Sequence, residues 1–152
     1  MKKQDYTAAI AANITADAAF KGITYVSAWW SENFEGSSEK EGDVFTIAFN
    51  ETTFVDFKVI EAVAGKKMAW LVTDCNLPWL ADKKEWNGTK MIFEIIPGHN
   101  ETQINFTHIG LVPEVECYDG CVKGWDQYIK DSLFKLLTEG KGQPQKRKLE
   151  TA

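Results

Sequence analysis

Apolar and polar residues alternate along residues 102–110, and a wider spacing of apolar residues follows along residues 118–137. In the first segment Ile104, Phe106 and His108 share one face, because successive side chains of a strand point to opposite sides. In the second segment apolar residues recur at steps of three and four, the spacing of one helical face. A helix of about 20 residues is roughly 30 Å long, about the diameter of a small domain. The two patterns predict a curved sheet that wraps around a long terminal helix and encloses a pocket.

The same alternation predicts the rest of the sheet. Five further segments alternate in this way and are predicted to be strands: residues 4–14, 44–50, 53–63, 67–74 and 89–97. Clean alternation gives a strand one buried and one solvated face, which is typical of an antiparallel sheet. Turn sequences at residues 64–66 and 97–100 join neighbouring strands. The pattern favours an α+β domain with a curved antiparallel sheet of about six or seven strands.

Two short helices are predicted after the first strand. Thr15 can cap the first helix, and Asp17 lies in its first turn, near the positive end of the helix dipole. Gly22 limits the length of this helix. A second short helix is predicted over residues 25–30, and the polar, glycine-containing residues 31–43 are predicted to form a loop.

A long insertion, residues 75–88, separates two of the predicted strands. Connections of this length are often functional. The insertion carries Trp79, Leu80 and Trp86, so we expect it to fold over an apolar surface. The sequence leaves open whether its two tryptophans stack on a ligand or fill the core, and whether the insertion is a lid.

A chain of 152 residues fits one domain, and at this size a core needs no disulfide or metal to be stable. Gly140 and Gly142 end the terminal helix. We therefore predict a single domain over residues 1–140. Residues 141–152 are predicted to be a disordered tail, because their few apolar side chains cannot offset the entropy lost on ordering. We expect the chain to keep its stability without the residues from about Gly142.

The charge balance narrows the class of partner. The formal net charge is -5, which argues against nucleic acid, since its binding proteins usually carry a basic face. No stretch approaches the roughly 20 apolar residues that span a bilayer, so no membrane insertion is expected. Asp5 and Asn13 interrupt the apolar run near the start, which makes a poor signal peptide. The three cysteines are an odd number and fit reduced thiols better than a disulfide framework, so we expect a cytoplasmic protein. The sequence leaves the oligomeric state open.

The order of elements and four local patterns together resemble a known family. The patterns are Ala28-Trp29-Trp30, residues 41–45 (EGDVF), Val59-Ile60-Glu61 with residues 66–70 (KKMAW), and Gly124-Trp125 with Tyr128, Ser132-Leu133 and Leu136. The chain resembles the helix-grip fold of the START-like (SRPBCC) superfamily, shared with the birch-pollen allergen and polyketide cyclases. The resemblance covers residues 4 to 140. Within the superfamily it is nearest to the branch related to the Aha-type activator of the heat-shock-protein-ninety ATPase.

The resemblance implies a pocket between the concave sheet face and the terminal helix. The candidate ligand-binding residues are Trp30, Phe57, Trp70, Trp79, Met91, Phe93, Phe106, His108, Cys121 and Trp125. The leading hypothesis is that this pocket binds a small apolar or amphipathic molecule, such as a lipid, with no cofactor. The alternatives are a co-chaperone-like interaction module with a chaperone partner, and a cyclase- or hydrolase-like enzyme. A nucleophile elbow, a phosphate loop, a metalloprotease helix and a dinucleotide fingerprint are all missing, so the sequence gives catalysis little support.

His108 has two interpretations. It could act as a general base or ligand partner in the pocket. It could instead be a neutral structural histidine, bonded to Tyr118 or to backbone under the helix. With Cys117 and Cys121 it would offer three soft ligands for zinc, but a fourth ligand is not apparent, so we predict no metal site.

Overall fold

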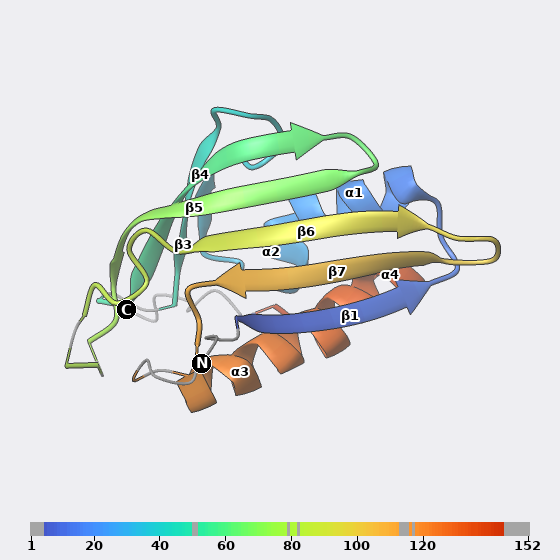
Figure 1. Cartoon of the computed structure of the whole chain (residues 1–152). Helices are drawn as coiled ribbons and strands as arrows, with labels where there is room; N and C mark the ends of the chain where they lie inside the picture. The colour runs from blue at the N-terminus through green and yellow to red at the C-terminus, as the bar shows by residue number, and fades with distance from the viewer. Residues whose placement is uncertain are drawn as a thin grey trace, which may run out of the picture.

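The computed structural model of the chain describes residues 5–49, 52–78, 80–81, 83–112, 116 and 118–144. Within them, seven strands form one antiparallel sheet in the order β1-β7-β6-β5-β4-β3-β2 (Figure 1). The strands are β1 (Tyr6–Ala12), β2 (Phe34–Gly36), β3 (Val44–Ala48), β4 (Phe54–Val63), β5 (Lys67–Asn76), β6 (Lys90–Pro97) and β7 (Thr102–Ile109). The predicted strands are confirmed. The prediction of a continuous loop over residues 31–43 is wrong, because β2 pairs with β3 inside it.

Two short helices follow β1, as predicted. Helix α1 (Ala16–Thr24) begins where the side chain of Thr15 accepts a hydrogen bond from the backbone nitrogen of Ala18 at 3.1 Å. Helix α2 (Val26–Trp29) follows directly. Both lie behind the sheet in Figure 1, on the side to which the buried strand residues point.

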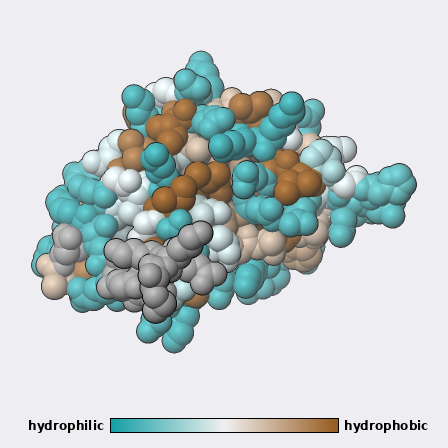
Figure 2. Space-filling view, in the orientation of Figure 1, coloured by the Kyte–Doolittle hydropathy of each residue, from teal (hydrophilic) through white to brown (hydrophobic). Residues whose placement is uncertain are grey.

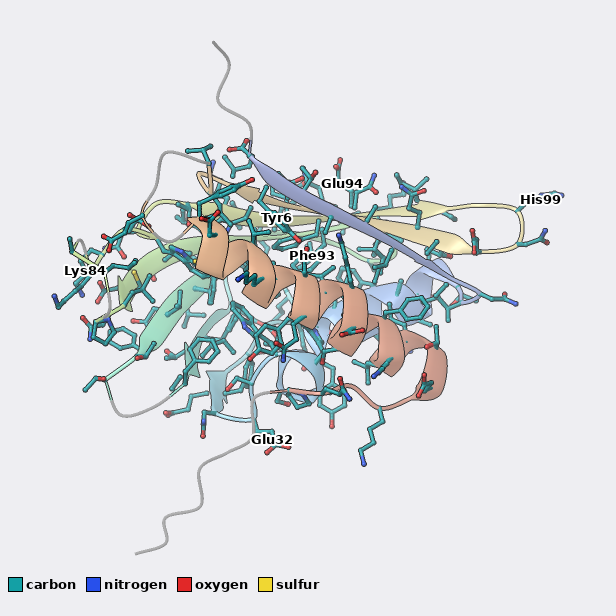
Figure 3. The ribbon with its side chains drawn as sticks, turned by 90° about the horizontal axis from the view of Figure 1, so that it is seen from below. Tyr6, Glu32, Lys84, Phe93, Glu94 and His99 are labelled. Atoms are coloured by element: carbon teal, nitrogen blue, oxygen red, sulfur yellow. The ribbon has the colours of Figure 1, made fainter. Side chains whose placement is uncertain are left out.

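The terminal helix crosses the same side of the sheet, as seen from below in Figure 3. It consists of α3 (Tyr118–Trp125), a π-helical segment η1 (Asp126–Leu133) and α4 (Phe134–Glu139). Gly140 ends it in the left-handed region, with a φ of 82°. A π-helix forms i→i+5 hydrogen bonds, is rare, and is often found at functional sites.

The predicted register of β7 is confirmed. Ile104, Phe106 and His108 are buried, and the residues between them are half-buried. The same alternation on β6 is visible in Figure 3, where Phe93 points toward the helix and Glu94 points away. Alternation therefore assigns the core face of the sheet correctly.

Two irregularities shape the other half of the sheet. The β4–β5 register shifts between Asp56 and Phe57 and again between Val59 and Glu61. Extra residues of this kind bend a strand and increase its twist. They lie on β4 and β5. Val55 of β4 lines a cavity together with Gly120 and Cys121 from the first half of the terminal helix.

The core holds the helix against the sheet. Trp125, Ile129 and Leu133 are buried. The other apolar residues on this face of the helix are partly buried and pack against the core: Tyr118, Val122, Leu136 and Leu137. The hydroxyl of Tyr6 on β1 donates to Asp126 on η1 at 2.5 Å, a second tie between sheet and helix.

Residues 141–144 pack beside the terminal helix. The backbone nitrogen of Gln143 donates to the hydroxyl of Ser132 at 2.6 Å, and that hydroxyl donates to the carbonyl of Trp29 at 2.6 Å. The rest of the tail predicted over residues 141–152 lies outside the described residues. The described part of the chain contains no helix long and apolar enough to cross a bilayer.

The outer face of the sheet carries mixed polarity. Figure 2 shows apolar patches separated by polar residues on this side. Exposed apolar side chains here include Val44, Ile96 and Ile109. Scattered exposure of this kind is normal for a folded protein surface.

Candidate functional site

A cavity of about 400 Å³ lies between the curled strands β3–β5 and the first half of the terminal helix. This volume falls within the range of small-molecule binding sites. Its described lining residues come from the turn between β3 and β4, from β4 itself, from the insertion after β5, from the end of α2 and from the terminal helix. They are Trp30, Phe49, Thr53, Val55, Leu77, Trp86, Gly120, Cys121, Gly124, Trp125 and Tyr128. The wall is mainly apolar.

The helix side of the cavity has two positions without a side chain. Gly120 and Gly124 are one turn apart, and a Cβ atom added at either would meet no atom within 4 Å. Glycine costs about 1 kcal/mol relative to alanine in a helix interior, where Gly124 lies, whereas Gly120 lies in the first turn of α3. At Gly124 the helix therefore forgoes stability where the cavity gains space.

Three tryptophans form the inner wall. The ring centroids of Trp30 and Trp125 are 4.8 Å apart, and Trp86 stacks on Trp125 with centroids 6.0 Å apart and planes within 11°. Trp70 continues the stack into the core, 6.2 Å from Trp30. Aromatic pairs at these distances stabilise one another beyond the area that they bury.

His108 is linked by hydrogen bonds to two of these tryptophans, directly to Trp125 and through Thr89 to Trp86. Its Nδ1 accepts a hydrogen bond from the indole nitrogen of Trp125 at 3.0 Å, and its Nε2 lies 2.9 Å from the hydroxyl of Thr89. An indole nitrogen only donates, so Nδ1 must be unprotonated and Nε2 carries the hydrogen. The Thr89 hydroxyl then accepts from Nε2 and donates to the carbonyl of Trp86 at 2.7 Å.

The environment of His108 keeps it neutral. The side chain is fully buried, and this burial lowers its pKa to about 3. Burial disfavours the charged imidazolium because it removes water from the ring. The partners of the ring are Trp125 and Thr89 rather than the predicted Tyr118 or backbone.

The predicted site residues divide into three groups. Trp30, Cys121 and Trp125 line the cavity. The second group lies in the packed core beneath the helix, off the cavity wall: Phe57, Trp70, Met91, Phe93, Phe106 and His108. Trp79 lies outside the described residues.

Several wall residues were not among the predicted site residues. They are Phe49, Thr53, Val55, Leu77, Trp86, Gly120, Gly124 and Tyr128. Two signals could have found some of them: the aromatic residue in the long insertion, and the glycines on an otherwise apolar helical stripe.

Polar chemistry on the wall is sparse. Among the described lining residues there is no Asp, Glu, Lys, Arg or His. Burial raises the pKa of the Tyr128 hydroxyl above its ordinary value, so this group stays protonated at neutral pH. Cys121 is half-buried with a free thiol, and the described residues contain no cluster of three His, Cys, Asp or Glu side chains able to hold a metal. Cys117, a ligand of the zinc site considered above, is outside them.

The insertion after β5 is tied to the segment that leads into α3. The backbone nitrogen of Ala81 donates to a carboxylate oxygen of Glu116 at 2.9 Å, and the nitrogen of Glu116 donates to Glu85 at 3.1 Å. Leu80 and Trp86 of the insertion are buried, which agrees with the expected apolar contact. The insertion therefore forms part of the cavity wall, and two of its residues, Ala81 and Glu85, are hydrogen-bonded to Glu116.

Comparison with known proteins agrees with this architecture. The family described as Activator of Hsp90 ATPase homolog 1-like protein matches residues 18–138. The solution structure of the Aha1 dimer from Colwellia psychrerythraea is similar, with a TM-score of 0.75 and 23% identity over 91% of this chain and 99% of that chain. Protein MLL2253 from Mesorhizobium loti has a TM-score of 0.66 and 16% identity over 87% of this chain and 96% of that chain.

DynU16, from the dynemicin biosynthetic locus, has a TM-score of 0.69 and 14% identity over 94% of this chain. The match covers 51% of DynU16, so this chain spans about half of its length. At these identities the similarities establish the fold alone, and they confirm the predicted helix-grip architecture. No protein of curated function matches the sequence.

Proposed function

Since the chain belongs to the Activator of Hsp90 ATPase homolog 1-like family, we propose that its cavity binds a small apolar or amphipathic molecule. The observation that carries this proposal is the cavity of about 400 Å³ with its mainly apolar wall. Apolar pockets of this size with a few polar atoms are the usual form of small-molecule sites.

Two features of the helix support the proposal. Gly120 and Gly124 leave space that alanine would fill, at a cost to helix stability. Tyr128 projects into the cavity from the π-helical segment, a type of backbone often associated with function. A helix selected only for packing would not need either feature.

Native mass spectrometry of freshly purified protein tests the proposal. We expect a noncovalent adduct that is lost on denaturation and is absent from Gly124→Leu, in which the cavity is filled. Gln127→Leu places the same side chain at an exposed site of the same helix and should keep the adduct. An adduct-free wild type whose melting temperature is also unchanged by added apolar dyes would contradict the proposal.

A second candidate function comes from the family description itself, which names activation of the Hsp90 ATPase. Under this hypothesis the chain binds a chaperone of that class, with or without a molecule in the cavity. Adding the purified chain to an Hsp90-type ATPase should then raise the rate of ATP hydrolysis. An unchanged rate at saturating chain concentration would count against it.

Catalysis gains little support from His108. Both ring nitrogens are bonded to Trp125 and Thr89, and burial lowers the pKa to about 3. A general base at neutral pH needs a pKa near 7 and access to a substrate proton. The binding proposal therefore stands ahead of a cyclase- or hydrolase-like activity.

A further inference from the structure

We infer that the cavity selects uncharged, flat aromatic molecules and rejects anions such as fatty acids. This inference rests on the binding function proposed above and names the class of molecule that the site takes. It follows from the absence of charge on the described wall, from the carboxylates near the helix end, and from the shape of the helix surface.

The first argument is the cost of burying a charge. An ionised group loses its hydration on entering the cavity and must be compensated by a counter-charge or several hydrogen bonds. The described lining residues supply no lysine, arginine or histidine. A carboxylate or sulfonate placed among Trp30, Val55 and Leu77 would therefore meet no counter-charge from the described lining residues.

The second argument concerns the start of the terminal helix, since Gly120 and Cys121 lie in its first turn. Free backbone N–H groups and the helix dipole at such an end attract anions in many proteins. Here Asp119 lies in the same turn, and Glu116 lies just before it. Asp119 lies where the dipole favours negative charge, and the Glu116 carboxylate accepts from the backbone nitrogen of Ala81. Both carboxylates repel a second anion.

The third argument is shape. Gly120 and Gly124 leave a strip of bare helix beside the cavity, and Trp86 and Trp125 are within 11° of parallel. A flat ring system can approach backbone closely where no Cβ intervenes. Aromatic residues around such a strip can contact it by offset stacking or edge-to-face packing.

A matched pair of dyes tests this inference. N-phenyl-1-naphthylamine is uncharged, and 1-anilinonaphthalene-8-sulfonate has the same aromatic skeleton with one added sulfonate. Titration of the wild type, followed by dye emission and by quenching of tryptophan fluorescence, gives a Kd for each. We expect the uncharged dye to bind at least about tenfold more tightly, a difference of about 1.4 kcal/mol.

A charge introduced at the wall controls for general hydrophobicity. Cys121→Lys adds a cation to a wall whose described residues include none, and it should shift the ratio of the two Kd values by at least about fivefold toward the sulfonate. Gly124→Leu should weaken both dyes, while Gln127→Leu should leave both unchanged. Loss of folding in one variant cannot mimic this pattern, because it would weaken both dyes and would not shift their Kd ratio toward the sulfonate.

The possible results distinguish failure of the charge selection from failure of the proposed binding function. Equal wild-type affinities, or a ratio that Cys121→Lys leaves unchanged, would overturn the charge selection and leave cavity binding in place. Binding of both dyes to Gly124→Leu with wild-type affinity would place them elsewhere and overturn the inference. If neither dye binds the wild type, the proposed cavity function itself fails, and this inference with it.

Discussion

The indole nitrogen of Trp125 donates a hydrogen bond of 3.0 Å to Nδ1 of His108, and both side chains are buried. The bond joins the terminal helix to β7, and through Thr89 it continues to the carbonyl of Trp86. Trp125 and Trp86 face the cavity, whereas His108 does not. His108 therefore positions two walls of the cavity relative to each other without lining it.

This burial predicts acid sensitivity. The folded-state pKa of His108 is about 3, whereas an unfolded histidine titrates near 6.5. Between these values the unfolded state binds the proton and the folded state does not. The contribution of the neutral His108 to the free energy of unfolding is thus fully present above about pH 6.5, and it is lost as the pH falls toward 3. At pH 4.5 the loss from this group is up to about 3 kcal/mol.

The chain supplies its own control for this prediction, because it contains only one other histidine, the exposed His99. Urea unfolding at pH 7 and 4.5 should show a smaller pH-dependent loss in His108→Gln than in the wild type. His99→Gln should retain the wild-type loss. Equal pH dependence in all three proteins would mean that His108 is solvated or charged in the folded state.

Trp125 anchors the helix through its ring as well as its hydrogen bond. Its ring centroid lies 4.5 Å from that of Phe106 on β7. Trp125→Ala should cost about 3–5 kcal/mol, as for other large core truncations. Trp125→Phe keeps a ring but leaves Nδ1 of His108 without its donor, and should cost about 1–3 kcal/mol. Denaturant titration measures both, and a loss under 1 kcal/mol for the alanine variant would mean that the helix is held elsewhere.

The sequence predicted those elements whose signals are local. The alternation in residues 102–110 placed His108 on the core face, and Thr15 was identified as the cap of α1. The spacing of apolar residues along residues 118–137 predicted the terminal helix, in which Trp125 and Ile129 are buried. In each case the signal lies within one element or at its cap, so no knowledge of the neighbouring elements was needed.

Features that depend on contacts between distant segments could not be predicted in the same way. Strand β2 has only three residues and forms because β3 offers a free edge. The partners of His108 come from the insertion and the helix. The cavity depends on where β4 and β5 bend, and the register shifts between Asp56 and Phe57 and between Val59 and Glu61 depend on how the two strands pair with each other.

Gly142 is predicted to be intolerant of any side chain. A Cβ atom there would lie 2.5 Å from the carbonyl oxygen of Ala28 and 2.9 Å from that of Ser132. Because backbone cannot give way as a flexible side chain can, Gly142→Ala should cost about 1–3 kcal/mol. Gly120→Ala is the matched control, since its Cβ meets open space and should add up to about 1 kcal/mol through helix propensity. Thermal unfolding of the two variants should therefore shift in opposite directions.

The same contacts refine what the tail contributes to stability. Composition alone predicts that the chain tolerates truncation from about Gly142, but Gln143 donates to Ser132, whose hydroxyl also holds the carbonyl of Trp29. A chain ending at Pro144 keeps this arrangement and should melt at the wild-type temperature. A chain ending at Gly140 loses it and should melt several degrees lower, since about 1 kcal/mol shifts Tm by roughly 2–8 °C in domains of this range of sizes. Equal melting temperatures for the two truncated chains would show that the Ser132–Gln143 bond contributes nothing to stability. A melting temperature below the wild-type value in the chain ending at Pro144 would assign a stabilising role to residues 145–152.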